Sequence, residues 1–280
     1  MQRAKADRLF YILCRAVTWV AVSTLLVLLV HILIQGASWL SVHFLTNFPS
    51  RHPHEAGVRA GLYGSVLIML ISAAFAVPVG IATALFLEEY MPKNRWWFFL
   101  QVNISNLAGM PSIIYGLLGL AIFVRFLGFE RSVLSGGLTL GLLTLPVIII
   151  ASQEAIRAVP RTLREAAYAL GAMRWQVIFG QVLPSAMPGI MTGIILAVSR
   201  AMGETAPLII VGAVSYISFT PTSLMDSFTV LPMQVFSWAG RPQEDFHSLA
   251  GAAIIVLLVL LFAMNLVAVY IRQRFQRYKI

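Results

Sequence analysis

The chain has 280 residues and a net charge of +9, and its composition is 59% hydrophobic but only 11% charged. Soluble domains carry about 25% charged residues, so the composition excludes an ordinary soluble protein. Apolar blocks of roughly 20 residues, long enough to cross a bilayer, account for nearly the whole chain. The positive charge is therefore assigned to loops facing the cytoplasm and not to nucleic-acid binding. The single cysteine, Cys14, excludes an internal disulfide.

The apolar blocks predict an all-α integral membrane protein with about six membrane-spanning helices. In chain order, the predicted spans are 17–34, 62–87, 98–123, 133–151, 189–213 and 249–271. Residues 1–16 then form a cytoplasmic N-terminal segment, 17–271 the transmembrane domain and 272–280 a basic cytoplasmic tail. The long connections are 35–61 and 214–248 on the outer side and 152–188 on the inner side.

The distribution of Lys and Arg supports placing both termini in the cytoplasm. That orientation puts 14 of these residues on the inner side and 5 on the outer side, with Arg200 inside a span. Cytoplasmic loops of membrane proteins collect positive charge, so the asymmetry has the expected sign. Trp96 and Trp97 fall at a predicted span end, where interfacial aromatic residues belong.

The third predicted span is interrupted by polar and helix-breaking residues. It contains Asn103, Asn106, Gly109, Pro111 and Ser112 within ten positions. Irregular backbone at membrane depth is tolerated where it is buried in protein or lines a wet cavity. We therefore expect Asn106 and Ser112 to line a substrate pathway. The alternative is a kinked packing helix with small residues at its interface.

The fifth predicted span carries an arginine and a glutamate four residues apart. Arg200 lies about eleven residues into this span, which predicts a position near the middle of the bilayer. Residues four apart share a helix face, so Arg200 and Glu204 can pair. Ionisable residues inside membranes usually face a pathway, and an arginine fork suits phosphate oxygens. The alternative is an ion pair that only holds the helices together.

The inner connection 152–188 predicts a short amphipathic helix followed by a second helical stretch. Pro160 is placed near the helix start, and Thr162 with Glu165 fits a capping box. Gly171 suits the end of the helix. The apolar stripe consists of Leu163, Ala166, Ala167 and Leu170. Such a helix can lie on the membrane surface or dock against another protein.

One spacing in this connection resembles the EAA loop of ABC importer permeases. The matching residues are Glu165, Ala166, Ala167, Gly171, Leu183 and Pro184. Gln181 stands where the family usually has isoleucine. The resemblance implies that the loop inserts into a cleft of a separate ATP-hydrolysing subunit. The chain itself has no Walker motif, because none of its lysines, Lys5, Lys93 and Lys279, follows a glycine.

Two further segments, 109–116 and 199–207, resemble the PstA-type permease family of phosphate importers. This resemblance implies a type I ABC importer fold in the bacterial inner membrane, with Arg200 and Glu204 on the phosphate route. It also implies a PstC-type permease partner, two ATP-binding subunits and a periplasmic phosphate-binding protein. ATP would bind to those partner subunits, and no cofactor would bind to this chain.

Other functions remain open from the sequence. The chain could import another oxyanion, such as sulfate or molybdate, or it could be a secondary transporter or channel that needs no ATPase. A membrane scaffold without transport is a third class. We expect no catalytic site and no metal site, since His52 and His54 are interpreted as a surface pair in an outer loop.

Overall fold

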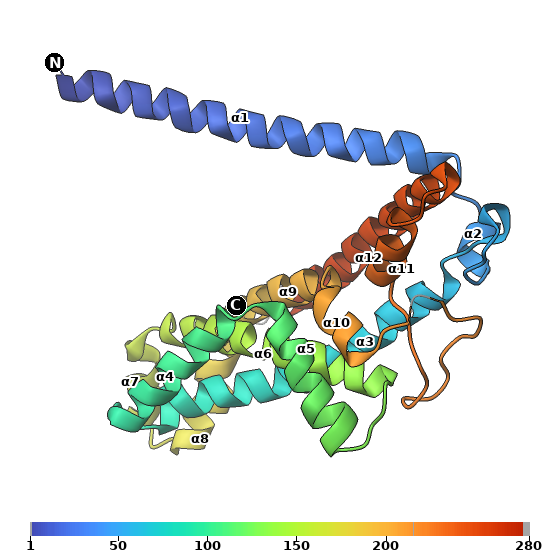
Figure 1. The fold of residues 1–280 in the computed structure, drawn as a ribbon. Helices are drawn as coiled ribbons and strands as arrows, with labels where there is room; N and C mark the ends of the chain where they lie inside the picture. The colour runs from blue at the N-terminus through green and yellow to red at the C-terminus, as the bar shows by residue number, and fades with distance from the viewer. Residues whose placement is uncertain (1, 215, 277–280) are drawn as a thin grey trace.

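The computed structural model describes residues 2–214 and 216–276 as an assembly of helices that differ widely in length (Figure 1). No strand occurs in these two ranges. The long helices are α1 (Gln2–Ala37), α3 (Arg59–Leu85), α6 (Val133–Arg157), α9 (Leu183–Met202) and α12 (Glu244–Gln276). Within the described residues, five helical segments are long and apolar enough to cross a membrane, or six if one bent pair counts as a span. The predicted all-α membrane fold is confirmed.

Short helical elements connect or extend the long helices. There are three π-helical segments in the described residues. Segment η2 (Phe86–Tyr90) extends α3, η3 (Leu120–Phe126) extends α5, and η4 (Ile178–Val182) joins α8 to α9. The remaining elements are α2 (Val42–Thr46), η1 (Pro53–Glu55), α4 (Arg95–Ala108), α5 (Ser112–Gly119), α7 (Arg161–Ala169), α8 (Arg174–Val177), α10 (Ala206–Val211) and α11 (Leu231–Ala239). Residues 277–280 of the predicted basic tail lie outside the described residues.

The core of the molecule forms where α3, α6 and α9 pack together. The most apolar window of α6 is 67% buried, which makes α6 the central helix of the candidate spans. Small residues allow the backbones to approach closely. A Cβ atom at Gly193 would lie 2.3 Å from the Cβ of Ala151, and one at Gly80 would lie 2.7 Å from Ile148. Buried Ile156 and Ile190 fill the same apolar cluster.

Helix α1 projects away from the rest of the molecule, as Figure 1 shows. It meets α12 near its carboxyl end, where a Cβ atom on Gly36 would lie 2.5 Å from the backbone of Gly251 and Ala252. The apolar window of α1 is 0% buried. Its apolar side chains therefore face lipid or a neighbouring subunit.

The third predicted span is a sharply bent pair of helices. Helix α4 ends at Ala108, α5 begins at Ser112, and the axes of the pair differ by 104°. Pro111 has no N–H to donate, and the residue before it avoids helical backbone. The predicted interruption of the span 98–123 is confirmed, and the break is sharp enough to separate two helices.

The fifth predicted span, 189–213, was also placed wrongly. The apolar segment runs from Arg174 to Met202. Helix α9 ends at Met202 with Gly203 as its C-cap, and Pro207 lies in the first turn of the separate helix α10. Proline is favoured in a first helical turn but cannot continue an existing helix. The break between 202 and 206 divides the residues that were assigned to one span.

The connection 216–230 is anchored on the amino end of α6. The backbone N–H groups of Val133 and Leu134 donate to the carbonyls of Asp226 at 3.0 Å and Leu224 at 2.9 Å. These bonds satisfy donors that a helix start leaves free. Phe228 is fully buried, and a Cβ atom at Gly136 would lie 2.7 Å from its ring. The connection is thus part of the packed structure.

Candidate functional site

A small cavity lies where the bent pair meets α6 and α9. Its volume is about 20 Å³, and both Ser112 and Arg200 line it. Tyr115 of α5 and Thr144 of α6 line the same space. The structure therefore brings together two of the four predicted pathway residues, which lie 88 positions apart in the sequence.

The other two predicted pathway residues lie outside the lining of this cavity. Asn106 is an exposed residue near the end of α4, and its backbone carbonyl accepts from the N–H of Gly109 at 3.1 Å. Glu204 follows the end of α9, and its Oε1 atom lies 3.8 Å from Nε of Arg200. The structure thus forms the predicted Arg200–Glu204 pair, while Asn106 remains apart from it.

Arg200 occupies the last turn of α9, not the middle of a span. This corrects the predicted mid-span position, because the helix ends only two residues later. A positive charge near a helix carboxyl end is favoured by the helix dipole. The Arg200 side chain is 62% exposed and that of Glu204 is 20% exposed. Because Arg200 is the exposed member of the pair, its guanidinium is accessible to another anionic partner.

The bend that forms one wall of the cavity is held by specific contacts. The Tyr115 hydroxyl donates to the Leu107 carbonyl at 2.8 Å, which ties α5 back to the end of α4. A Cβ atom at Gly116 would lie 2.8 Å from Cα of Pro207, so α5 packs closely on α10. These contacts fix the amino end of α5 beside Arg200.

The predicted amphipathic helix of the inner connection is α7, which begins at Arg161 after Pro160. The predicted capping box is wrong, because Pro160 occupies the N-cap and makes no side-chain cap bond. Its proline ring holds φ at −56°, and Thr162 consequently becomes the second helical residue.

The end of α7 follows the prediction. Gly171 has φ +81°, a conformation that glycine adopts without strain. Its N–H donates to the Tyr168 carbonyl at 2.9 Å, and the N–H of Ala172 donates to Ala167 at 3.2 Å. These two bonds form a Schellman motif, the usual way to close a helix with glycine.

Most of α7 is exposed. Glu165, Ala166 and the apolar Leu163 are exposed, and Leu170 just past the helix is 90% exposed. Ala167 is partly buried and packs against the main apolar cluster. The predicted apolar stripe therefore presents an uncovered surface. Leu183 and Pro184, the last two residues of the EAA-like pattern, form the start of α9.

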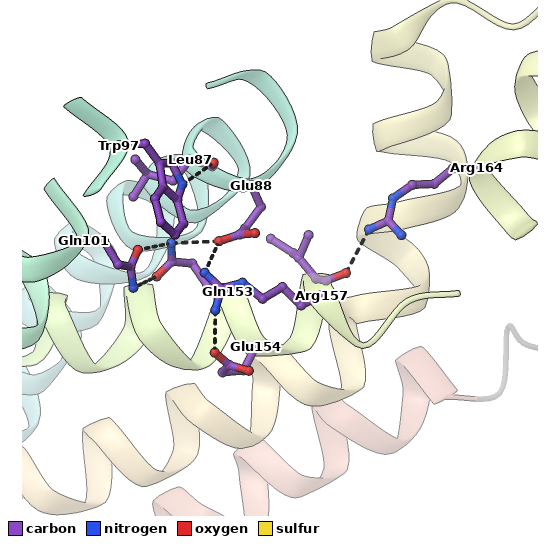
Figure 2. A network of polar contacts seen from close by, with 9 residues as sticks. Leu87, Glu88, Trp97, Gln101, Gln153, Glu154, Arg157 and Arg164 are labelled. Atoms are coloured by element: carbon purple, nitrogen blue, oxygen red, sulfur yellow. Dashed lines mark hydrogen bonds and ion pairs between the residues drawn. The ribbon is translucent and has the colours of Figure 1, made fainter. Parts of the chain in front are cut away.

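A network of polar side chains joins η2, the middle of α4 and the end of α6 near α7 (Figure 2). Glu88 of η2 accepts from Arg157 at 2.5 Å and from Gln153 at 3.1 Å. Gln153 exchanges hydrogen bonds with Gln101 of α4 at 2.9 and 3.3 Å. Arg157 also pairs with Glu154 at 2.9 Å.

Sequence reasoning missed this network. Its signal was present in the adjacent pair Glu88 and Glu89, which directly follow the second apolar block. An open pocket of about 520 Å³ lies beside the network. It is lined by Glu88, Glu89, Lys93, Ile156, Arg157, Arg161, Arg164, Glu165 and Tyr168. The pocket places Glu165 of the EAA-like pattern next to the ends of the spanning helices.

Within residues 2–214 and 216–276, no group of three or more His, Cys, Asp or Glu side chains could hold a metal ion. His54 stacks on Trp39 with ring centroids 5.2 Å apart.

Residues 76–277 match the family described as "Binding-protein-dependent transport system inner membrane component". The chain belongs to this family, and it is therefore a multi-pass permease subunit of an ABC importer in the bacterial inner membrane. The family uses ATP through partner ATPase subunits and receives substrate from binding proteins. Within the family, the sequence is of the PstA type, as its relatives indicate.

Two curated relatives are similar over most of the chain. Identity is 33% over 280 residues to the probable ABC transporter permease protein YqgI of Bacillus subtilis, covering 94% of each chain. Identity is 38% over 215 residues to the phosphate transport system permease protein PstA of Mycobacterium leprae, covering 75% of this chain and 68% of the relative.

A solved structure shows the same fold. The bacterial alginate ABC transporter in complex with an alginate pentasaccharide-bound periplasmic protein matches with a TM-score of 0.69 and 18% identity, over 96% of both chains. At this identity the likeness concerns the fold alone, and it agrees with the predicted type I importer architecture.

Proposed function

We propose that this chain is the permease subunit of an ATP-driven importer of inorganic phosphate. The observation that carries the proposal is the cavity shared by Ser112 and Arg200, together with the similarity to a relative named as a phosphate permease. The route for the anion passes Arg200 and Glu204, with Ser112 and Asn106 on the bent pair beside it.

The chemistry of this cavity favours a small oxyanion. The first N–H groups of a helix have no partner within the helix, and they carry partial positive charge. Helix α5 begins at Ser112 without a side-chain cap. Because Ser112 and Arg200 line the same cavity, the amino end of α5 and the guanidinium border one space. A planar guanidinium can donate two parallel bonds to a phosphate. The exposed Arg200 can exchange its 3.8 Å contact with Glu204 for such an anion.

The partners follow from the coupling surface. The exposed face of α7, with Glu165 and Ala166, docks into a cleft of an ATP-binding subunit, and Gly171 ends the docking helix. A PstC-type permease completes the pathway, and two ATP-binding subunits drive it. A periplasmic phosphate-binding protein delivers the anion to the outer connections. ATP binding and hydrolysis occur on those subunits, and this chain holds no ATP site.

The test is uptake of labelled phosphate in cells that lack only this chain. The cells are complemented with the wild type, Arg200→Ala, Glu165→Arg or the control Arg95→Ala, and membrane expression is checked by blot. Arg95 is an exposed residue at the start of α4 and has no side-chain partner among the described residues. We expect uptake with the wild type and with Arg95→Ala, and loss of uptake in the other two.

Each failure identifies a different part of the proposal. If uptake never depends on the chain, the phosphate assignment is wrong, and labelled sulfate and molybdate are measured in the same cells. If uptake depends on the chain but Glu165→Arg is silent, docking through α7 is wrong and transport without an ATPase becomes the better explanation. If Arg200→Ala retains full uptake, the anion route lies elsewhere.

A further inference from the structure

The guanidinium of Arg164 joins three elements at the end of the molecule that carries α7. Its Nη1 atom donates to the Val159 carbonyl at 2.7 Å, and Nη2 donates to the Ile156 carbonyl at 2.9 Å. Its Nε and Nη2 atoms also donate to Oε1 of Glu89 at 3.2 and 3.0 Å. Figure 2 shows Arg164 extending from its own helix toward the end of α6. One side chain thus connects α7 with the end of α6 and with η2.

Arginine is suited to this position because it offers several donors in a fixed plane. The last carbonyl groups of α6 lack partners within that helix, and Arg164 supplies donors to two carbonyls at this end. The side chains of Arg164 and Glu89 are only 18% and 12% exposed. Partly buried pairs are screened by salt much less than exposed ones. A lysine would keep the charge but lose the simultaneous contacts.

The rest of α7 is held less firmly. Within the described residues, Arg164 is the only α7 side chain that hydrogen-bonds another element. Ala167 adds a small apolar contact, and the remaining α7 side chains are exposed. A displacement of α7 would therefore reach α6 and η2 through the short turn at 158–160 and through Arg164, whereas the route to α9 runs through α8 and η4.

The adjacent carboxylates of Glu88 and Glu89, on η2 at the end of α3, bind different helices. Glu88 binds Arg157 and Gln153, which both belong to α6. Glu89 binds Arg164 of α7. The Glu88 contacts hold the spanning helices to one another, whereas the Glu89 contact links them to α7. Removing Arg164 should spare the first set of contacts.

We propose that Arg164 is a positioning residue that carries movement of α7 into the ends of α3 and α6. The inference rests on the proposed function, because the movement originates in an ATP-binding subunit docked on the exposed face of α7. Arg164 touches neither the anion nor ATP in this account. Its contribution is the rigid link between the docking helix and the helices that border the pathway.

The experiment measures the coupling between α7 and the cavity without using the transported substrate. Cys14 is replaced by serine and Ser112 by cysteine, so that this chain carries a single thiol, at the cavity, and its labelling is read on the separated band of this chain. The full importer complex is purified, and the labelling rate of this thiol by a membrane-impermeant maleimide is measured with and without a non-hydrolysable ATP analogue. The amount of co-purified ATP-binding subunit is measured in the same samples. Arg164→Gln, Arg164→Lys and Glu89→Gln are compared with the control Arg95→Gln.

We expect Arg164→Gln to retain the ATP-binding subunit while the nucleotide-dependent change in labelling falls about fivefold, in the range of couplings carried by single residues. Arg164→Lys should show an intermediate change. Glu89→Gln keeps the arginine and its two carbonyl bonds, so it should fold normally and lose part of the response. Arg95→Gln should respond like the parent.

Two results would overturn the positioning role. Arg164→Gln could respond as fully as Arg95→Gln, or it could lose the ATP-binding subunit, which would make Arg164 a docking residue. If the parent complex binds no ATP-binding subunit, or if its labelling ignores the nucleotide, the proposed function itself fails, and the inference fails with it.

Discussion

Arg200 combines a weak internal partner with an open environment. Its contact with Glu204 is 3.8 Å long, and the arginine is the more exposed of the two side chains. At 3.8 Å and with the arginine largely exposed, the pair contributes little to folding. Such a loosely held guanidinium suits the exchange of partners that the proposed anion route requires.

Replacing Glu204 separates a gating role from a structural one. We expect Glu204→Gln to change the stability of the purified protein by less than about 1 kcal/mol, because exposed ion pairs contribute little. Phosphate uptake should change clearly, since Arg200 would be released from its only acidic neighbour within reach among the described residues. Thermal unfolding and labelled uptake are measured on the same variant. A large loss of stability with proportionate loss of uptake would identify a structural pair instead.

Asp226 makes the local stability of the connection 216–230 depend on pH. Its carboxylate accepts from the N–H groups of Thr222 and Ser223, both at 2.8 Å. These bonds lower the pKa of Asp226 below its ordinary value. A lowered folded-state pKa means that the stabilisation is present above the unfolded pKa of about 3.9 and is lost as pH falls through the lower folded value.

We expect Asp226→Ala to loosen residues 222–226 at neutral pH, whereas the wild type loosens there only in acid. Hydrogen exchange of this segment, corrected for the intrinsic pH dependence of exchange, checks the expectation. Equal protection in both proteins at neutral pH would show that the backbone bonds to Val133 and Leu134 hold the segment without the carboxylate.

At the scale of elements, the contact between α6 and α9 depends on the absence of side chains. Gly193 and Gly189 face Ala151 and Ala155, with hypothetical Cβ distances of 2.3 and 2.8 Å. No apolar driving force brings helices together in lipid, so close backbone packing supplies much of their association.

A methyl group added at Gly193 should destabilise the protein, and removing the facing methyl group of Ala151 should restore stability. We expect Gly193→Ala to cost about 1–3 kcal/mol through overpacking. The double variant Gly193→Ala, Ala151→Gly should recover most of the loss. Gly180→Ala is the control, since nothing lies within 4 Å of its hypothetical Cβ. Thermal unfolding followed by tryptophan fluorescence provides the measurement, and an unchanged midpoint in Gly193→Ala would contradict the packing argument.

The sequence predicted the elements better than it predicted their ends. Long apolar blocks predicted the spanning helices, and Gly171 predicted the end of α7. Both predictions succeeded because each signal is local in the sequence. The break at Pro111 was visible as irregularity, but its 104° bend depends on distant packing, such as Gly116 against Pro207. Thr162 fitted a capping motif, yet Pro160 started the helix earlier.

The candidate site was predicted only where its residues are close to one another in the sequence. Arg200 and Glu204 are neighbours in the sequence, so their pairing could be expected. The meeting of Ser112 with Arg200 was suggested only by a shared expectation of a pathway. The network around Glu88, Gln153 and Gln101 was missed, because these residues come from three separate helices. Only the fold brings them within hydrogen-bonding distance.

At the scale of the whole molecule, the bent pair decides the topology. If α4 and α5 together cross the membrane, the chain has six spans and both termini lie on one side. If the pair enters and leaves on the same side, the five remaining spans put the termini on opposite sides. The positive charge distribution favours the first arrangement.

Reporter fusions distinguish these arrangements. We expect green fluorescent protein to fluoresce when it is fused to either terminus, because it folds in the cytoplasm. Alkaline phosphatase inserted at Arg51 should be active, since the connection 35–61 is predicted to lie outside. A fluorescent N-terminal fusion with a dark but expressed C-terminal fusion would show that the bent pair is re-entrant.

The exposed helix α1 has a thermodynamic consequence of its own. None of its apolar window is buried within this chain, so wherever α1 faces lipid its free energy comes from partition between water and hydrocarbon, much as for a solute in a solvent. Its lipid-facing positions should therefore respond to the total hydropathy of their side chains and hardly to their shape. Only the short crossing at Gly36 requires a particular residue, so one helix contains a stretch governed by solubility and one point governed by fit.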